Sequence, residues 1–154
     1  MQTSERLIRI SVPEQRLQLM GDDGNVLASY PVSTSRFGLG SEEGSRKTPL
    51  GRFKIGEKIG SDFPIGTVFQ GRVPLAPDDP LPPTEDLIMS RILWLDGLEE
   101  HNANTRQRYI YIHGTNHEDK IGQPASHGCI RMRNNDLVAL FDQVPLGAEV
   151  VIET

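Results

Sequence analysis

The first third of the chain alternates apolar and polar residues with the period of two that is typical of β-strands. Residues 8–12 and 17–19 carry Ile, Val or Leu at every second position. A turn-forming Asp-Asp-Gly-Asn sequence follows at 22–25, and residues 26–32 alternate again. This pattern predicts an antiparallel β-meander over the first 33 residues.

The middle of the chain predicts strands separated by long loops. Gly, Ser and charged residues fill 35–51, and five prolines within 73–83 indicate an extended surface loop. Apolar segments at 52–55 and 87–95 predict strands, whereas residues 99–106 are polar and predict a loop.

A further strand is expected at 109–113, where aromatic and β-branched residues alternate. In this strand Tyr109, Tyr111 and His113 share one face, and the two intervening isoleucines share the other. His113 is the last residue of this predicted strand.

One helix is predicted near the C-terminus. The apolar residues 137–141 follow Asn134-Asn135-Asp136, which are residue types that cap helix N-termini, and Pro145 and Gly147 are expected to end the helix. Residues 150–152 predict a closing strand. We therefore expect a mainly-β fold with one or two short helices.

Composition and charge narrow the class of protein. The 154 residues have an ordinary globular composition and contain no internal repeat or linker, which predicts a single domain over 1–154. The net charge of -5 argues against a nucleic-acid partner. The longest apolar run has five residues, far fewer than the roughly 20 of a membrane helix, so no membrane partner is expected.

The compartment depends on whether Met1 is the native start. The single cysteine cannot form an intrachain disulfide, and the first six residues contain no apolar core of a secretory signal. We expect a cytoplasmic protein if Met1 is the native start, and a periplasmic or envelope protein if a leader has been removed. Nothing in the sequence indicates an oligomeric state.

The candidate chemistry centres on that single cysteine. Cys129 lies in a Ser126-His127-Gly128-Cys129 turn, and His113 ends the strand 16 residues upstream. A thiol attacks as the thiolate, so it needs a base or a positive field nearby, and either His113 or His127 fits that need. The approach of His113 from a separate strand favours it as the base.

The turn also supplies candidate oxyanion donors. Gly128 allows backbone amides to approach a reacting carbonyl without an intervening side chain. The amides of His127, Gly128 and Cys129 are then candidates for an oxyanion hole, in which each donor is often worth ~3 kcal/mol.

Together these stretches resemble the L,D-transpeptidase catalytic domain. The resemblance rests on His113-Gly114-Thr115 and on the Ser-His-Gly-Cys-Ile-Arg-Met sequence at 126–132. It extends to Tyr-Pro-Val-Ser-Thr at 30–34, to Lys-Thr-Pro-Leu-Gly-Arg-Phe at 47–53, and to Asn134-Asn135-Asp136 before the apolar helix. It spans nearly the whole chain and implies a single-domain, β-sandwich-like catalytic fold.

The resemblance implies a cysteine enzyme of peptidoglycan stem peptides. The nucleophile, Cys129, would cleave the bond between the L-centre of diaminopimelate and D-Ala and form a thioester. Water would release a trimmed peptide, as in an L,D-carboxypeptidase of muropeptide recycling, and the lack of an export signal favours this outcome. The alternative is transfer to an amine, as in an L,D-transpeptidase. Acylation of the thiol by carbapenems is also expected.

The resemblance further implies roles for individual residues. His113 is the general base, oriented by the backbone carbonyl of Gly114, and His127 and Gly128 shape the oxyanion hole. Substrate contacts are expected from Arg131, Ser126, Tyr111 and Trp94. No cofactor and no metal are expected.

Alternatives of a different class use the same residues. Cys129 could be a buried structural thiol, or His113, His117, His127 and Cys129 could supply zinc ligands. The domain could also bind peptidoglycan stems without catalysis. Among the single residues, His127 could be purely structural, Arg131 could pair with a surface carboxylate, and Tyr111 and Trp94 could pack in the core.

Overall fold

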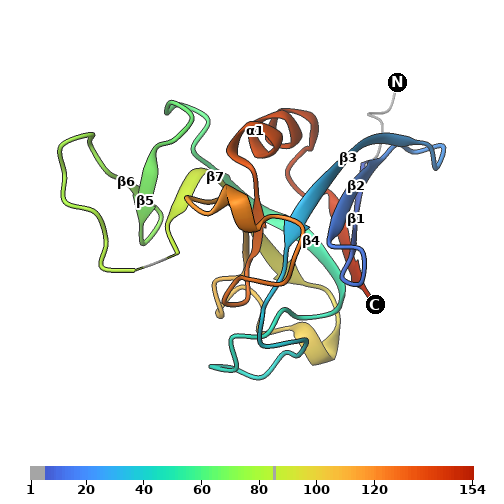
Figure 1. The fold of residues 1–154 in the computed structure, drawn as a ribbon. Coiled ribbons are helices and arrows are strands. Elements are labelled where there is room, and N and C mark those ends of the chain that lie inside the picture. Colours follow the sequence, from blue (N-terminus) through green and yellow to red (C-terminus); the bar gives the residue numbers. More distant parts are fainter. Residues whose placement is uncertain (1–5, 85) are drawn as a thin grey trace.

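Hydrogen bonding joins eight strands into a closed barrel in the computed structural model, which describes residues 6–84 and 86–154 (Figure 1). The order around the barrel is β4-β10-β1-β2-β3-β9-β8-β7, and a direct pairing between β7 and β4 closes it. The β5–β6 hairpin extends this sheet beyond β7 and projects to one side of the barrel.

Ten strands, one α-helix and two 3-10 helices make up the described regular structure. The strands are β1 (Leu7–Ser11), β2 (Arg16–Met20), β3 (Val26–Ser33), β4 (Gly51–Ile59), β5 (Val68–Gln70), β6 (Val73–Pro74), β7 (Ile88–Gly97), β8 (Tyr111–Gly114), β9 (Ile130–Met132) and β10 (Glu149–Glu153). The helices are α1 (Asn134–Gln143) and the 3-10 turns Glu100–Asn102 and Glu118–Lys120.

The mainly-β class with one helix is confirmed, as is the N-terminal meander. β1 pairs antiparallel with β2, and β2 pairs antiparallel with β3. The predicted closing strand β10 lies between β1 and β4, parallel to the first and antiparallel to the second. The sandwich-like core expected from the resemblance takes the form of a barrel because β4 also pairs with β7.

The barrel interior is a continuous apolar core. The inward positions of the alternating strands, such as Ile8, Leu17 and Ile112, are fully buried. α1 packs against β7 and β8 and adds Leu137 and Phe141 to the same core. This interior fixes the strands at whose ends the candidate site residues lie. No described helix has the length and apolar character needed to cross a membrane.

Two expectations of local structure are wrong. β8 begins at Tyr111 rather than at Tyr109, because Tyr109 has a φ of +58° and therefore interrupts the extended backbone. The N-cap of α1 is Arg133, so Asn134-Asn135-Asp136 form the first helical turn. The Asn134 side chain donates instead to the Thr115 carbonyl, 2.9 Å away, which ties the helix start to the end of β8.

Candidate active site

The cysteine turn lies at the start of β9, directly beside β8. These strands are parallel, with Ile112 opposite Ile130 and His113 opposite Arg131. The Tyr111 amide donates to the Cys129 Sγ over 3.3 Å. The register therefore brings the Cys129 thiol close to the strand of His113, although 15 residues lie between Cys129 and His113 in the chain.

The Cys129 thiol is held in its protonated form. Its sulfur packs against the aromatic cluster of Phe69 and Tyr111 and donates to the Tyr109 carbonyl over 3.3 Å. Burial by these groups raises the pKa of the Cys129 thiol to about 12, an effect that the Tyr111 amide partly opposes. Attack by this thiol therefore requires a base that removes its proton.

His113 has the protonation state of a general base. The residue is 1% exposed, and its Nδ1 lies 2.5 Å from the Gly114 carbonyl oxygen. Because a carbonyl can only accept, Nδ1 carries the proton and Nε2 keeps its lone pair. Burial lowers the pKa of His113, and the nearby Asp86 carboxylate only partly opposes this shift. The imidazole is thus neutral and oriented near neutral pH.

Ser126 holds the turn together from inside. Its side chain is fully buried, its Oγ donates to the Cys129 carbonyl over 2.6 Å, and it accepts from the Gly128 amide over 3.2 Å. The expected substrate contact by Ser126 is therefore replaced by a structural role, because no part of the residue is exposed.

Thr48 ties the same turn to the loop before β4. Its Oγ1 donates to the Gly128 carbonyl over 2.9 Å and accepts from the Ser35 amide over the same distance. Gly128 has a φ of +124°, a conformation that favours glycine, so the turn depends on this residue as well. The Thr48-Pro49 sequence thus positions the cysteine turn through the hydrogen bond of Thr48 to Gly128.

The candidate oxyanion hole has fewer available N–H donors than expected. The Gly128 amide is occupied by Ser126, which removes it from the expected set of donors. Among the described residues, neither the His127 amide nor the Cys129 amide donates a hydrogen bond to the protein. These two N–H groups are therefore the ones available to a developing oxyanion.

A mostly buried carboxylate that the sequence does not predict, Asp86, lies within electrostatic range of the site. Asp86 Oδ1 is 3.0 Å from the Arg131 Nε, close enough for an ion pair although not aligned as a hydrogen bond. The Asp86 charge raises the pKa of His113, His127 and Cys129 alike. No local pattern marks Asp86, which follows a proline-rich loop and precedes a buried strand.

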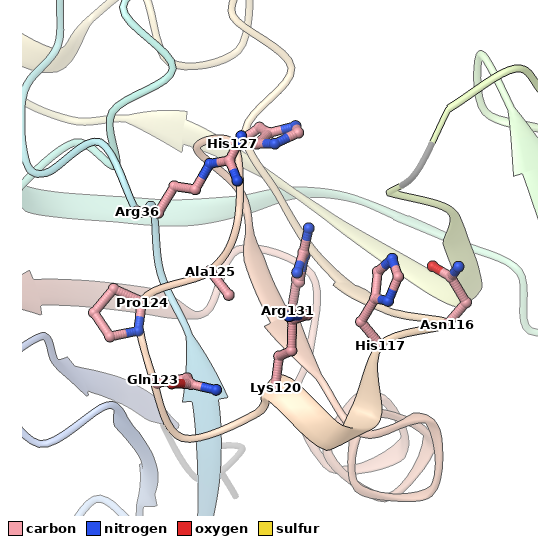
Figure 2. Close-up of a pocket in the computed structure, with 9 residues that line it drawn as sticks. All are labelled: Arg36, Asn116, His117, Lys120, Gln123, Pro124, Ala125, His127 and Arg131. Carbon is pink, nitrogen blue, oxygen red and sulfur yellow. The ribbon is translucent and has the colours of Figure 1, made fainter.

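Arg131 and His127 each lie two residues from Cys129 in the chain. The Arg131 side chain is 4% exposed and that of Asp86 is 12% exposed, so this ion pair lies mostly inside the protein rather than on the surface. His127 is partly exposed, with its ring centroid 5.8 Å from that of Phe37. Burial lowers the pKa of His127, which leaves it neutral near neutral pH. Both residues line the pocket drawn in Figure 2.

Tyr111 and Trp94 form the other wall around the thiol. They are paired in the sheet and make an edge-to-face contact with ring centroids 5.6 Å apart. Arg72, from the β5–β6 turn, donates to the Tyr111 hydroxyl over 2.9 Å and lies 4.8 Å from the Trp94 ring. Tyr111 is 3% exposed, and Arg106 lies over the Trp94 ring as well, so packing dominates at both residues.

The arrangement does not assemble the alternative zinc site. Within residues 6–84 and 86–154, no group of three or more His, Cys, Asp and Glu side chains is placed to hold a metal ion. The β8–β9 pairing brings the segments of His113 and Cys129 side by side, whereas His117 lies in the loop after β8.

Comparison with known proteins agrees with this geometry. The family profile described as YkuD, the L,D-transpeptidase catalytic domain, matches residues 5–152. YqjB of Bacillus subtilis (strain 168), whose name places it among the L,D-transpeptidases, is 33% identical over 130 residues. That alignment covers 84% of this chain and 61% of YqjB, so the chain spans less than two thirds of this relative.

Solved structures share the fold at low sequence identity. An L,D-transpeptidase from Mycobacterium smegmatis superposes with a TM-score of 0.66 at 19% identity, covering 98% of this chain and 59% of the other. The L,D-transpeptidase LdtMt1, solved in complex with imipenem, gives a TM-score of 0.61 at 19% identity, with coverages of 97% and 59%.

Proposed function

The chain belongs to the L,D-transpeptidase catalytic-domain family, and from this premise we propose that Cys129 is the nucleophile of a thioester-forming enzyme. Its donor substrate is the tetrapeptide stem of peptidoglycan, cleaved between the L-centre of diaminopimelate and D-Ala. The observation that carries the proposal is the neutral His113, whose Nδ1 proton is held by Gly114 while its Nε2 remains basic.

The first half of the reaction transfers the acyl group to sulfur. His113 Nε2 takes the Cys129 proton as the sulfur attacks the carbonyl carbon of the L-centre. The amides of His127 and Cys129 stabilise the oxyanion that forms. The C–N bond to D-Ala then breaks, the imidazolium returns its proton to the leaving amine, and a thioester remains.

The second half resolves the thioester, and two acceptors have support. Cys129 is partly exposed, so water can reach the thioester and release a tripeptide. The names of the relatives favour attack by an amine, which gives a cross-link or an exchanged D-amino acid. In either case His113 removes the proton of the acceptor and the thiol is restored.

Mass spectrometry of the products tests this proposal. The protein is incubated with a tetrapeptide ending in D-Ala, with and without a D-amino acid or a second stem. Loss of one alanine indicates hydrolysis, whereas an exchanged or dimeric product indicates transfer. The Cys129→Ala variant is expected to give neither product. An unchanged tetrapeptide with the native protein in both conditions would refute the catalytic proposal.

A carbapenem provides a second test of the nucleophile. Because LdtMt1 was solved with imipenem, we expect imipenem to acylate Cys129 through opening of its β-lactam ring. Intact-mass analysis should show one adduct on the native protein and none on Cys129→Ala. An adduct that persists on the variant would place the reactive group elsewhere.

A further inference from the structure

A pocket of about 500 Å³ adjoins the cysteine turn and is lined by cationic side chains (Figure 2). Arg36, Lys120 and Arg131 come from three separate segments of the chain, and no Asp or Glu among the described residues lines the pocket with them. In Figure 2 Arg36 lies beside His127, and Arg131 extends toward them from the floor. Such a pocket attracts an anionic group.

Arg131 lies at the floor of this pocket, and its buried Nε has no hydrogen-bond partner within the described residues. Its side chain is 4% exposed, and its guanidinium carries five N–H donors. Within the described residues its charged partner is Asp86, and its Nε makes no aligned hydrogen bond to that carboxylate. Buried donors normally have acceptors, so the pocket side of this guanidinium is suited to ligand oxygens.

Arg36 and Lys120 add charge at the mouth of the pocket. Both side chains are exposed, so neither is needed for packing. Among the described residues Asp86 is paired with Arg131, and no carboxylate is paired with Arg36 or Lys120, so the described lining has an excess of positive charge. The planar Arg131 guanidinium matches the two oxygens of a carboxylate, and the two outer cations favour its approach.

The pocket adjoins the turn that carries the cysteine. Its wall is the segment Gln123–His127, which leads directly into Gly128 and Cys129. Arg131 lies opposite His113 across the β8–β9 pair. The Arg131 charge also reaches the reacting groups, since it lowers the pKa of both His113 and Cys129. A carboxylate held here therefore lies beside the turn that carries the nucleophile.

We propose that this pocket is a carboxylate-binding subsite for the donor stem, with Arg131 as its floor and Arg36 and Lys120 as its mouth. This inference rests on the proposed function for the identity of the stem. A tetrapeptide with diaminopimelate offers three free carboxylates: the one of D-Glu, the one at the D-centre of diaminopimelate, and the C-terminal one. The subsite takes one of them.

Equilibrium binding to the Cys129→Ala protein tests the subsite without requiring turnover. The Kd of the tetrapeptide is compared with those of three peptides in which one carboxylate at a time is an amide. We expect one of the amides to bind about tenfold more weakly, as for loss of charge-assisted hydrogen bonds. That amide identifies which carboxylate occupies the pocket.

The cations are then removed as a pair. Arg36→Gln combined with Lys120→Gln should weaken binding of the native tetrapeptide by about threefold to tenfold. The same pair should leave the Kd of the sensitive amide nearly unchanged, because the charge it would contact is already gone. Arg9→Gln combined with Lys54→Gln is the matched control, since it removes two cations from β1 and β4, outside the pocket. It should bind like the parent.

Each outcome decides the inference. Equal affinity for all four peptides, an unchanged Kd in the pocket pair, an equal loss in the control pair, or no binding up to millimolar peptide overturns the subsite. If the native enzyme processes no tetrapeptide but the charge-dependent binding is present, the catalytic proposal alone fails. If turnover occurs without any dependence on the carboxylates, the subsite alone fails.

Discussion

At the scale of single residues, the site at rest holds a neutral thiol beside a neutral imidazole. Burial acts on both groups in the direction that removes charge: it raises the pKa of Cys129 and lowers that of His113. Such a pair differs from a preformed thiolate–imidazolium pair, because the proton moves only as the sulfur attacks. The acyl group must therefore be positioned before the nucleophile is formed.

The pH dependence of alkylation checks this state. With a thiol pKa of about 12, the rate of alkylation of Cys129 by iodoacetamide should rise about tenfold per pH unit from pH 6 to 9. The same protein unfolded in urea is the control, and its single cysteine should begin to level off near pH 9. A plateau below pH 8 in the folded protein would mean that the thiolate is already present.

At the scale of elements, the reactive turn depends on segments that are distant in the chain. Thr48, from the loop before β4, donates to the Gly128 carbonyl, and the Ser126 hydroxyl accepts from the Gly128 amide and donates to the Cys129 carbonyl. Asn134, at the start of α1, fixes the end of β8 through the Thr115 carbonyl. Three hydrogen-bonding side chains thus position the two strands that carry the thiol and the base.

Replacement of Thr48 by valine removes its hydroxyl while keeping a side chain of similar size and shape. Thr48→Val should destabilise the fold by about 1–3 kcal/mol, because the Gly128 carbonyl and the Ser35 amide lose their partner in a buried place. Displacement of the turn should lower kcat/KM by roughly tenfold to a hundredfold. Chemical denaturation and steady-state kinetics measure the two effects.

Thr48→Ser is the matched variant, since it keeps the hydroxyl and removes only a methyl group. Its activity should stay within about threefold of the native value. If serine and valine reduced activity equally, the hydroxyl would have no role in holding the turn, and packing by the methyl group would explain both losses.

At the scale of the whole molecule, the site is built on strands of the closed barrel, and its base is buried there rather than carried on a surface loop. β8 and β9 are strands of the barrel wall, so His113 is buried by the same packing that stabilises the fold. Its imidazole must remain neutral to stay there. Protonation of His113 therefore couples the state of the site to the stability of the protein.

The free energy of unfolding should fall as the pH is lowered from 7 to 5.5. The unfolded chain binds protons at its histidines near pH 6.5, whereas His113 and His127 have lowered pKa values in the folded state. Below pH 6.5 the unfolded state thus holds more protons, and stability is lost with falling pH. Thermal unfolding at pH 7 and at 5.5 measures the difference in Tm.

The variant His113→Gln isolates one of these groups. Whatever its own stability, its Tm should change less between the two pH values than that of the native protein. His127→Gln should reduce the difference further. An unchanged difference in His113→Gln would show that this buried imidazole is not the group that takes up the proton.

The sequence by itself determined most strands of the barrel, the one α-helix and the reactive motif. Alternation depends only on neighbouring residues, so it located the strands of the N-terminal meander and the closing strand β10. The sequence 126–132, with His113 upstream, indicated a thiol and a base of one family. The sequence pattern placed the start of β8 wrongly, because Tyr109 has a positive φ that alternation does not reveal. It also placed the N-cap of α1 wrongly, because Arg133 occupies that position without a capping side chain.

Only the tertiary structure decided which residues meet. The β4–β7 pairing that closes the barrel, the Asp86–Arg131 ion pair and the hydrogen bond from Thr48 to Gly128, 80 residues away, all join segments without any shared local pattern. Ser126 is predicted as a substrate contact from its place in the motif, but burial inside the turn makes it a support. Periodicity reports on one strand and its faces, whereas register and burial arise only when all eight strands close around one core.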